Sequence, residues 1–308
     1  MVIGNQVIGK EKSEGGSVMS KRIFILGVMT LILAGITACG KKETKELTFA
    51  MLPQMSNTEL FKCWNPLLKY LEKEAGVKFA QVFPKDFTEH VRLCQEGKID
   101  FAYSNPFTYV QIAPKPGERP GGHLSLAIAQ EPQGAVFYGE FIVRDDNTEI
   151  KELKDIKDRK GWIVGYKSAG GYLYQKGYAL YHGIDLPNDC TLTESQDNKQ
   201  EKVIMAVYNR ETEFGCVRNG MRVKLKGRID LNQIRVLAET ERYPSWAFSA
   251  YKEVDPVIAK KIKEALSNMP AELFDKASLP GGVIGFAEAT DKNFDSVRKL
   301  AEKVEMEY

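Results

Sequence analysis

The chain has 308 residues, 27% of them charged, and its 43 Lys and Arg nearly balance its 41 Asp and Glu. Removal of residues 1–38, which hold four of those basic and two of those acidic residues, leaves 39 of each. A neutral chain without a basic tract argues against nucleic-acid binding. The length suffices for a large core or for two lobes.

The N-terminal region is typical of an exported protein. Residues 19–38 begin with Lys21 and Arg22, continue with an apolar stretch that is short for a membrane span, and end on small residues before Cys39. This is the layout of a secretory signal, and its end resembles the lipobox of a bacterial lipoprotein, in which Cys39 becomes the acylated N-terminus. An ordinary signal peptide and an N-terminal anchor helix remain alternatives.

The segments on either side of this signal are expected to lie outside the fold. Residues 1–18 are polar and precede Met19, so they are either a mis-assigned start or a disordered extension. Residues 39–46 are rich in Lys and Glu, and we expect a flexible tether there.

Strands and helices alternate from Leu47 onward. Apolar residues recur at three- and four-residue steps between Leu60 and Leu71, which predicts a helix that ends before Gly76. Pro66 lies inside this stripe, so the helix is either kinked there or begins there with Asn65 as its cap. The predicted order is strand 47–52, this helix, strand 77–83, helix 87–96 and strand 99–103. Such β-α-β-α-β order predicts a parallel sheet with helices on both faces.

The same order occurs a second time after a Pro- and Gly-rich stretch at 114–122. Strands are predicted at 124–129, 136–143, 162–166, 191–193 and 213–217, with helices at 171–182 and 198–208. The last 70 residues add a strand at 234–238, an aromatic turn at 243–246 and helices near 255–267 and 290–303. The chain is therefore predicted to be an α/β protein with two lobes, and its tail to return to the first lobe.

Cysteine and histidine spacing gives no support for a metal site. There is no CxxC or HExxH motif, and no carboxylate lies at ligand spacing from a histidine. An exported compartment permits disulfides, so the sequence leaves open whether four cysteines are buried thiols or bridged: Cys63, Cys94, Cys190 and Cys216. No cofactor is expected.

A short motif stands where a strand is predicted to lead into a helix. Ser168-Ala169-Gly170-Gly171 follows the apolar run at 162–164 and precedes an aromatic helical pattern. A tight turn would explain it. It would equally suit an anion, because a helix start offers unpaired N–H groups and the positive end of the helix dipole.

Four stretches in order carry a resemblance to a known family. They are Trp64–Leu71; Gly97–Tyr103 with Pro106 and Tyr109; Gly165–Leu173; and Ala206-Val207 leading to Glu213-Phe214-Gly215. From Leu47 to about Phe286, the chain resembles the substrate-binding lipoproteins of phosphate, phosphite and phosphonate ABC importers. The resemblance implies the two-lobed, type II-like periplasmic binding protein fold, with residues 47–140 and 239–308 in lobe 1 and residues 141–238 in lobe 2.

The resemblance implies that a small oxyanion binds in the second lobe at the serine turn. Similar proteins have Ser-Thr-Ser-Gly there, whereas this chain keeps Ser168 and Gly171 and has Ala169 and Gly170 between them. Backbone donors survive these replacements and two hydroxyl donors are lost, so we expect a different ligand or a ligand held differently.

Other expected contacts in the second lobe differ from the family pattern. Gln200 falls where a histidine is common, and Glu213 where an aspartate usually accepts a hydrogen bond from the ligand. Arg218 has a guanidinium that suits an oxyanion, but we expect it to be solvated and its replacement by Ala to change little.

The first lobe is expected to contribute residues from the carboxyl ends of its strands, where open α/β sheets bind ligands. These candidates are Gln54, Tyr103, Ser104, Asn105 and Tyr109. Tyr138 and Trp246 lie near the two crossings between lobes and are interpreted as packing residues. We expect the hinge near 138–141 and 239–246, closing on the ligand.

The favoured interpretation is a lipid-anchored, extracytoplasmic and monomeric binding protein that delivers a small oxyanion to an ABC permease. One alternative is a ligand sensor that partners a membrane histidine kinase; related arsenite sensors would make Cys216, near the expected site, relevant. Another is an enzyme of the thiamine-precursor type on the same fold. No nucleophile–base pair or carboxylate dyad supports catalysis.

Overall fold

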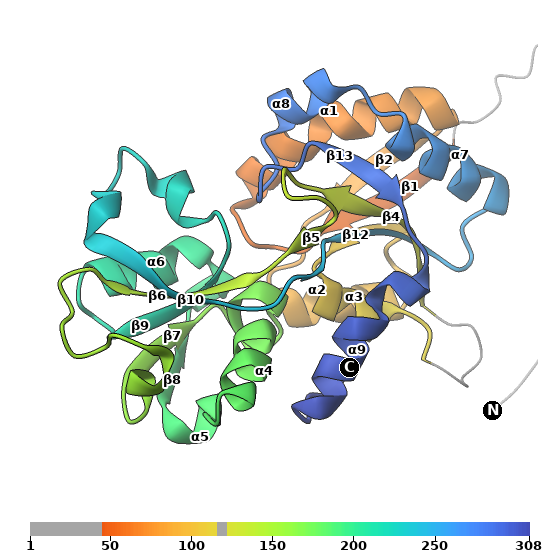
Figure 1. Cartoon of the computed structure of the whole chain (residues 1–308). Helices are drawn as coiled ribbons and strands as arrows, with labels where there is room; N and C mark the ends of the chain where they lie inside the picture. The colour runs from red at the N-terminus through yellow and green to blue at the C-terminus, as the bar shows by residue number, and fades with distance from the viewer. Residues whose placement is uncertain (1–44, 116–121) are drawn as a thin grey trace, which may run out of the picture. The chain divides into compact units, whose positions relative to one another are not determined.

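Two mixed β-sheets, each covered by helices, form the body of the chain, and a short two-stranded ribbon joins them (Figure 1). The computed structural model describes residues 45–115 and 122–308, which belong to one compact unit. The predicted signal, Cys39 and nearly all of the predicted tether lie outside these described residues. The expected two-lobed α/β fold is confirmed.

The first sheet has the strand order β13-β4-β12-β3-β1-β2. Its strands are β1 (Glu46–Met51), β2 (Lys78–Val82), β3 (Phe101–Ser104), β4 (His123–Gln130), β12 (Ala247–Tyr251) and β13 (Gly285–Glu288). Strands β2, β1 and β3 are parallel, whereas β12, β4 and β13 pair antiparallel. The tail therefore returns to this sheet, as expected.

The second sheet has the order β10-β6-β9-β7-β8. Its strands are β6 (Gly139–Arg144), β7 (Lys160–Ile163), β8 (Thr191–Glu194), β9 (Phe214–Arg218) and β10 (Ile234–Glu239). Strands β8, β7 and β9 are parallel, and β6 and β10 are antiparallel to their neighbours. The parallel pairing predicted from the β-α-β-α-β order is found for these three strands in each lobe, and the other strands add antiparallel pairs. Helical crossovers require parallel pairing only for the strands that they connect directly.

Helices cover both faces of the first sheet (Figure 1). On one face lie α1 (Asn57–Ala75), α7 (Pro256–Ser267) and α8 (Ala271–Ala277); on the other lie α2 (Phe87–Gln95), α3 (Pro106–Ile112) and α9 (Asp295–Lys303). The first of these helices begins at a capping box between Ser56 and Glu59 and continues through Pro66. The alternative in which the helix begins at Pro66 was therefore wrong, because buried side chains on either side hold one helix together. The kink at Pro66 stays a prediction.

The second sheet is covered by shorter helices. They are α4 (Tyr174–Tyr181), α5 (Leu186–Asp189) and α6 (Gln200–Tyr208), and a π-helical turn, η2 (Ala169–Leu173), leads into α4. Short 3-10 turns lie at η1 (Leu153–Ile156), η3 (Gln196–Asn198), η4 (Arg222–Leu225), η5 (Leu231–Gln233) and η6 (Asp291–Phe294), the last of which precedes α9.

The chain crosses between the two sheets as a ribbon of β5 (Val136–Phe137) and β11 (Tyr243–Pro244), which pair antiparallel. Just beyond it, Gly139 donates its N–H to Thr240 Oγ1 at 2.9 Å, and Thr240 returns its N–H to the Gly139 carbonyl. Two strands that share hydrogen bonds at the crossing form a natural axis for lobe rotation.

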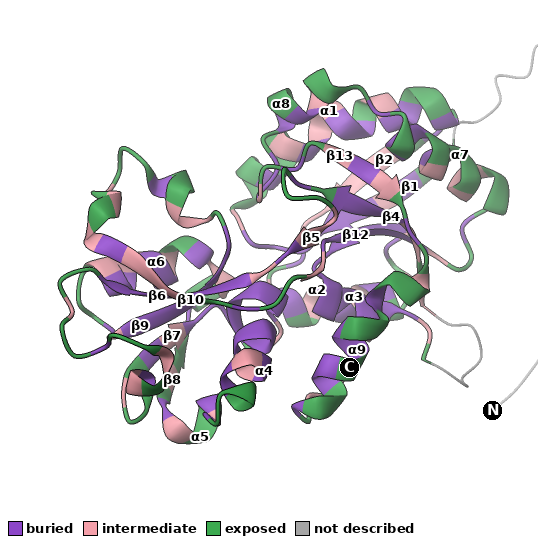
Figure 2. Cartoon of the chain, in the orientation of Figure 1, coloured by how far each residue is buried: buried purple, intermediate pink, exposed green. Residues whose placement is uncertain are grey.

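Most strand residues of both sheets are buried, and the helices expose their outer faces (Figure 2). The four cysteines among the described residues are free, and Cys94, Cys190 and Cys216 are buried. None of the helices in the described ranges combines the length and apolarity that membrane crossing requires.

Candidate functional site

A small cavity lies where the two sheets meet, and both sheets contribute to its wall. Its lining residues are Gln54, Phe87, Asn105, Phe137, Ser168, Gly170, Gln200, Arg218 and Trp246. Several of them stand at the carboxyl ends of parallel strands: Gln54 after β1, Asn105 after β3, and Arg218 at the end of β9. The cavity volume is about 10 Å³, which is room for roughly one water molecule.

The serine turn faces this cavity and is shaped by its small residues. Ser168 caps η2, because its Oγ accepts the Gly171 N–H at 3.1 Å. A Cβ on Gly170 would lie 2.6 Å from the Phe137 ring and 2.9 Å from Arg218 Cβ, so only glycine permits this approach. The N–H groups of Ala169 and Gly170 have no acceptor within the described ranges.

A buried glutamine fastens the turn to the second sheet. Gln175 Nε2 donates to the carbonyls of Gly170 at 2.9 Å and Val217 at 3.0 Å, and its side chain is fully buried. The turn is therefore tied to the strand that ends at Arg218. Because Gln175 lies four residues after Gly171, at the start of α4, its spacing from the turn could have drawn attention to it.

Arg218 is buried, and the expectation of a solvated arginine was wrong. It is 2% exposed, and its Nη2 lies 2.6 Å from Glu131 Oε1, which also accepts the Ser245 hydroxyl at 2.9 Å. Its guanidinium carbon stands 4.6 Å from the centre of the Phe137 ring. A guanidinium can be held out of water because a carboxylate and an aromatic face compensate for the lost hydration.

Unused hydrogen-bond donors border the cavity. Arg218 Nε and Trp246 Nε1 are buried and have no acceptor in the part of the chain that the structure describes. Gln200 accepts the Arg218 backbone N–H at 3.0 Å through Oε1, which leaves its amide NH₂ to donate. The Ser168 oxygen is engaged as a cap, and its proton remains to be donated. An excess of donors over acceptors suits a ligand with several oxygen acceptors.

Tyr103 and Ser104 lie behind the cavity wall rather than in it. The Tyr103 ring packs between Trp64 and Trp246, with ring centres 4.8 and 5.2 Å away, and burial raises the pKa of its hydroxyl. Ser104 Oγ lies 2.8 Å from His90 Nε2 and is fully buried. Both candidates therefore support the wall, since neither lines it.

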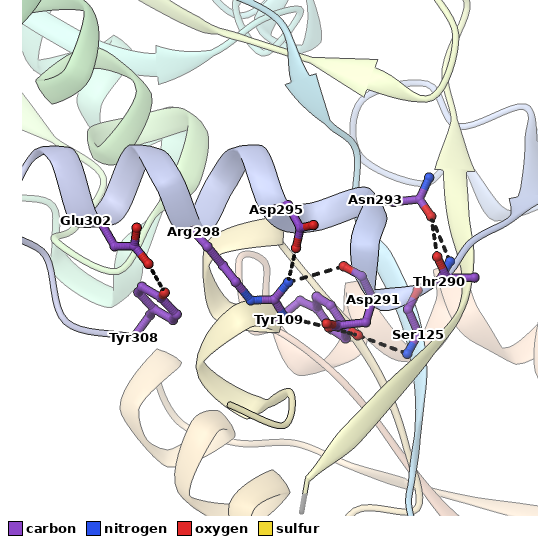
Figure 3. A network of polar contacts seen from close by, with 9 residues as sticks. All are labelled: Tyr109, Ser125, Thr290, Asp291, Asn293, Asp295, Arg298, Glu302 and Tyr308. Atoms are coloured by element: carbon purple, nitrogen blue, oxygen red, sulfur yellow. Dashed lines mark hydrogen bonds and ion pairs between the residues drawn. The ribbon is translucent and has the colours of Figure 1, made fainter. Parts of the chain in front are cut away.

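Tyr109 belongs to a different polar network, which is drawn in Figure 3. Its hydroxyl donates to Asp291 Oδ1 and accepts the Ser125 N–H, each at 3.0 Å, and Arg298 binds the same carboxylate. This network joins α3 to α9. The expectation that Tyr109 contacts the ligand was wrong, because its hydroxyl already bonds to two partners away from the cavity.

Glu213 lies at the opposite end of β9 from the cavity. Its carboxylate accepts from Arg159 Nη1 at 3.0 Å and from the Lys160 N–H at 2.9 Å. A strand advances about 3.3 Å per residue, so five residues separate Glu213 from Arg218 by roughly 16 Å. The acidic residue that the fold brings to the cavity is Glu131 instead.

Ala169, Gly171 and Cys216 are buried but do not line the cavity. Cys216 packs in the apolar cluster that contains Phe141 and Cys190, and burial raises the pKa of its thiol well above the ordinary value. Cys216 stands two residues before Arg218 on β9, and its thiol does not reach the cavity. Within the described ranges, no three His, Cys, Asp or Glu side chains gather as metal ligands do.

Sequence reasoning missed several wall residues. Trp246 was interpreted as packing, although its position in the aromatic turn near a crossing was a usable signal. Phe87 and Phe137 were seen only as parts of a helix and a strand. Glu131 carried no signal, since its partner Arg218 lies 87 residues away.

Comparison with known proteins agrees with this arrangement. The family model "ABC transporter, phosphonate, periplasmic substrate-binding protein" matches residues 49–294. The phosphate-import protein PhnD of Mycolicibacterium smegmatis is 24% identical over 287 residues, which cover 86% of this chain and 87% of that protein.

Two further likenesses bear on fold and role. The structure of PhnD1 from Prochlorococcus marinus in complex with methylphosphonate has a TM-score of 0.72 at 15% identity, covering 85% of this chain and 98% of that one. The tetrathionate sensor histidine kinase TtrS of Salmonella typhimurium is 22% identical over 225 residues, which are 68% of this chain and 37% of the kinase. Because the family model spans most of the two-lobed fold, this chain belongs to the family of periplasmic substrate-binding proteins of phosphonate ABC transporters.

Proposed function

We propose that this protein captures a small oxyanion of the phosphonate, phosphite or phosphate type between its lobes and presents it to an ABC permease. The observation that carries the proposal is the set of buried donors around one cavity, above all Arg218 Nε and Trp246 Nε1. Ser168, Gln200 and the Gly170 N–H add further donors. Phosphonate oxygens are acceptors that can satisfy several such groups at once.

The charge of the site favours recognition by hydrogen bonds. Glu131 balances the guanidinium of Arg218, so the buried pair contributes no net charge. A ligand is then selected by how many of the fixed donors it satisfies, because a donor left without an acceptor in a closed site penalises the wrong molecule. Gln200 stands where a histidine is common in similar proteins, and an uncharged amide likewise recognises a ligand by hydrogen bonds rather than by charge.

Entry of the ligand requires the lobes to open. The lobe boundaries expected from the sequence shift by one or two residues, because Gly139, Glu140 and Glu239 pair within the second sheet. We therefore take residues 139–239 as lobe 2 and the first sheet with its helices as lobe 1, with the hinge at the ribbon of β5 and β11. A ligand that contacts both walls shifts the population towards the closed form. The protein would act as a monomer, since each lobe supplies its own wall of the same cavity.

Calorimetry of the chain without its signal tests this function. The titrants are methylphosphonate, phosphite, phosphate, sulfate and arsenite, with thermal shift as a second measurement. We expect binding of at least one phosphorus oxyanion and weaker binding of sulfate. If none of these compounds releases heat or raises the melting temperature, the oxyanion function is rejected.

A second candidate is ligand sensing, and the likeness to part of a sensor histidine kinase favours it. Both roles use the same closed form, so the partner decides between them. Reconstitution with the membrane proteins encoded beside its gene distinguishes the two roles. As part of an importer, the liganded protein stimulates ATP hydrolysis and uptake by the transporter; as a sensor, it changes the autophosphorylation of a kinase. Family membership makes a catalytic role the least supported of the three.

We also propose that Cys39 carries a lipid and holds the protein to the outer face of a membrane. Mass spectrometry of the membrane-extracted protein should find an N-terminus at Cys39 with added acyl mass. Cys39→Ser should release the protein from the membrane fraction. An unmodified N-terminus at another residue would contradict the anchor.

A further inference from the structure

A second hollow lies outside the ligand cavity, and the two share part of their walls. Gln54 and Gln200 line both of them, so their side chains form the boundary between the inner cavity and this outer hollow. We call the hollow the vestibule and define it by Met55, Glu59, Lys199, Met221, Lys224 and Arg228. Its cavity volume is about 350 Å³, compared with about 10 Å³ inside.

The inner cavity alone is too small for an organic ligand. Space for about one water molecule does not hold a tetrahedral oxyanion with a substituent unless Gln54 and Gln200 move apart. Once these side chains part, the two hollows become continuous. A substituent on the bound oxyanion can then extend through this gap and into the vestibule.

The vestibule contains more cations than its acids neutralise. Its lining also includes Glu201 and Lys202, so four basic residues accompany two acidic ones. Arg228 Nη1 lies 2.8 Å from Glu201 Oε2, which accounts for one pair. Lys202 bonds instead to Asp197 outside the vestibule, at 3.3 Å.

Glu59 is engaged by its own helix. Its carboxylate accepts the N–H of Ser56 at 3.0 Å and the Ser56 hydroxyl at 2.6 Å, and these bonds lower its pKa. Neither Lys199 nor Lys224 lies within ion-pair distance of Glu59 or of any other acidic side chain in the described part of the chain. Two lysines therefore line the vestibule without a direct ion pair among the described residues, and Asp197, Glu59 and Glu201 act on Lys199 only from beyond contact distance.

Lys199 is the stronger evidence for an anion site, because it is half-buried just before α6. Burial lowers its pKa, and the carboxylates of Asp197, Glu59 and Glu201 offset this loss of hydration only in part. An anionic group beside it would restore the lost stabilisation. Beside these lysines, the thioethers of Met55 and Met221 and the buried Leu225 offer an apolar surface for a carbon linker.

We infer that the vestibule is a second subsite, and that the preferred ligand is an organic phosphonate or phosphate ester with a second anionic group rather than an inorganic oxyanion. This inference rests on the proposed function, because the first anionic group occupies the inner cavity. The second group, a carboxylate or phosphate at the end of a short carbon chain, pairs with Lys199 and Lys224.

Calorimetry with matched phosphonates tests the subsite. The anionic series is phosphonoacetate, 3-phosphonopropionate and 4-phosphonobutyrate, each compared with its uncharged carboxamide and with methylphosphonate. We expect the best acid of the series to bind at least tenfold more tightly than its amide at low salt, and the ratio to shrink as salt is added.

The double variant Lys199→Gln/Lys224→Gln should bring the acid-to-amide ratio close to one. Lys226→Gln, which removes an exposed lysine outside the vestibule, should retain the wild-type ratio. Circular dichroism and melting temperature establish that each variant is folded. Both results together support the subsite.

The other outcomes separate the two proposals. If methylphosphonate binds and each acid binds within threefold of its amide, the subsite is refuted and the oxyanion function stands. A tenfold ratio that persists in the double variant also refutes the subsite, because other residues then recognise the second anion. If neither methylphosphonate, nor the acids, nor the amides bind, the phosphonate function itself fails.

Discussion

Arg218→Met is the substitution that most directly tests the architecture of the cavity. It removes the guanidinium while keeping an apolar stem over the Phe137 ring. Glu131 is then a fully buried carboxylate without a cation, and it keeps the hydrogen bonds from the Ser245 hydroxyl and from Gln133 Nε2, each at 2.9 Å. Removing one partner of a buried ion pair costs about 3–5 kcal/mol, because the other charge stays desolvated and unpaired. We expect the free energy of unfolding to fall by that amount.

The same substitution removes a charged donor from the ligand. A hydrogen bond to a charged group contributes about 1.5–3 kcal/mol, so affinity for methylphosphonate should fall roughly 10- to 150-fold. Glu131→Gln should act in the opposite direction, because it leaves the guanidinium without its buried counterion and strengthens its attraction to the anion. The double variant Arg218→Met/Glu131→Gln should regain part of the lost stability but none of the lost affinity.

Urea unfolding and calorimetry on the same samples measure the two effects separately. Arg159→Met is the matched control, because Arg159 pairs with Glu149 and Glu213 at the far end of the second sheet. A partly exposed pair of this kind contributes about 0–1 kcal/mol, and affinity should not change. A folded Arg218→Met protein that binds methylphosphonate within threefold of wild type would refute the placement of this guanidinium against the ligand.

Three further predictions concern the serine turn and the pH dependence of stability. Ser168→Ala should weaken ligand binding at least tenfold and lower the free energy of unfolding by about 1 kcal/mol, because the helix cap is lost. Ser168→Thr should restore both affinity and stability. An unchanged affinity of Ser168→Ala in calorimetry would exclude a contact between the hydroxyl and the ligand. Gly170→Ala should lower stability by about 1–3 kcal/mol, because its Cβ would overlap Phe137, and an unaltered melting temperature would contradict the close approach. His90 and His123 are fully buried, and burial lowers the pKa of each from 6.5 to about 3. Protons therefore bind the unfolded chain first, so stability is intact above pH 6.5 and falls on acidification, by about 2 kcal/mol per histidine at pH 5. His123→Asn should reduce that fall in urea unfolding measured at pH 7 and pH 5, and an identical fall would show that other groups cause it.

The order of the elements could be predicted because periodicity is a local property. The stripe from Leu60 to Leu71 marks the face of α1 that packs on the first sheet, and the run at 47–52 marks β1 with an error of one residue. Several short elements were missed, among them the helices α3, α5 and α8 and the strands β12 and β13. Four to seven residues carry too few turns of a helix or alternations of a strand. The antiparallel pairs were missed as well, since antiparallel return strands leave no mark in the order of helices and strands.

Five of the residues that line the cavity were among the predicted site residues. Gln54 and Asn105 were found at strand ends, because the carboxyl ends of parallel strands meet at one edge of a sheet. Ser168 and Gly170 were found from the serine turn, and Gln200 from the family resemblance. Glu213 was misplaced because counting residues from a motif does not reveal which end of a strand they occupy. Arg218 was misjudged because an arginine is usually exposed, and the carboxylate that permits its burial belongs to the other sheet.

The unused donors also give closure its dependence on ligand. Arg218 belongs to the second sheet and Trp246 leads into a strand of the first, so Arg218 Nε and Trp246 Nε1 are buried together only where the two lobes meet. Each buried donor without an acceptor costs about 1–3 kcal/mol, and the pair therefore disfavours closure without ligand by about 2–6 kcal/mol. An oxyanion that accepts from both donors removes this cost and shifts the closing equilibrium by roughly one and a half to four powers of ten. The donors that bind the ligand are thus the same groups that destabilise the closed form when no ligand is bound. A partner protein that binds only the closed form therefore responds to the presence of the ligand.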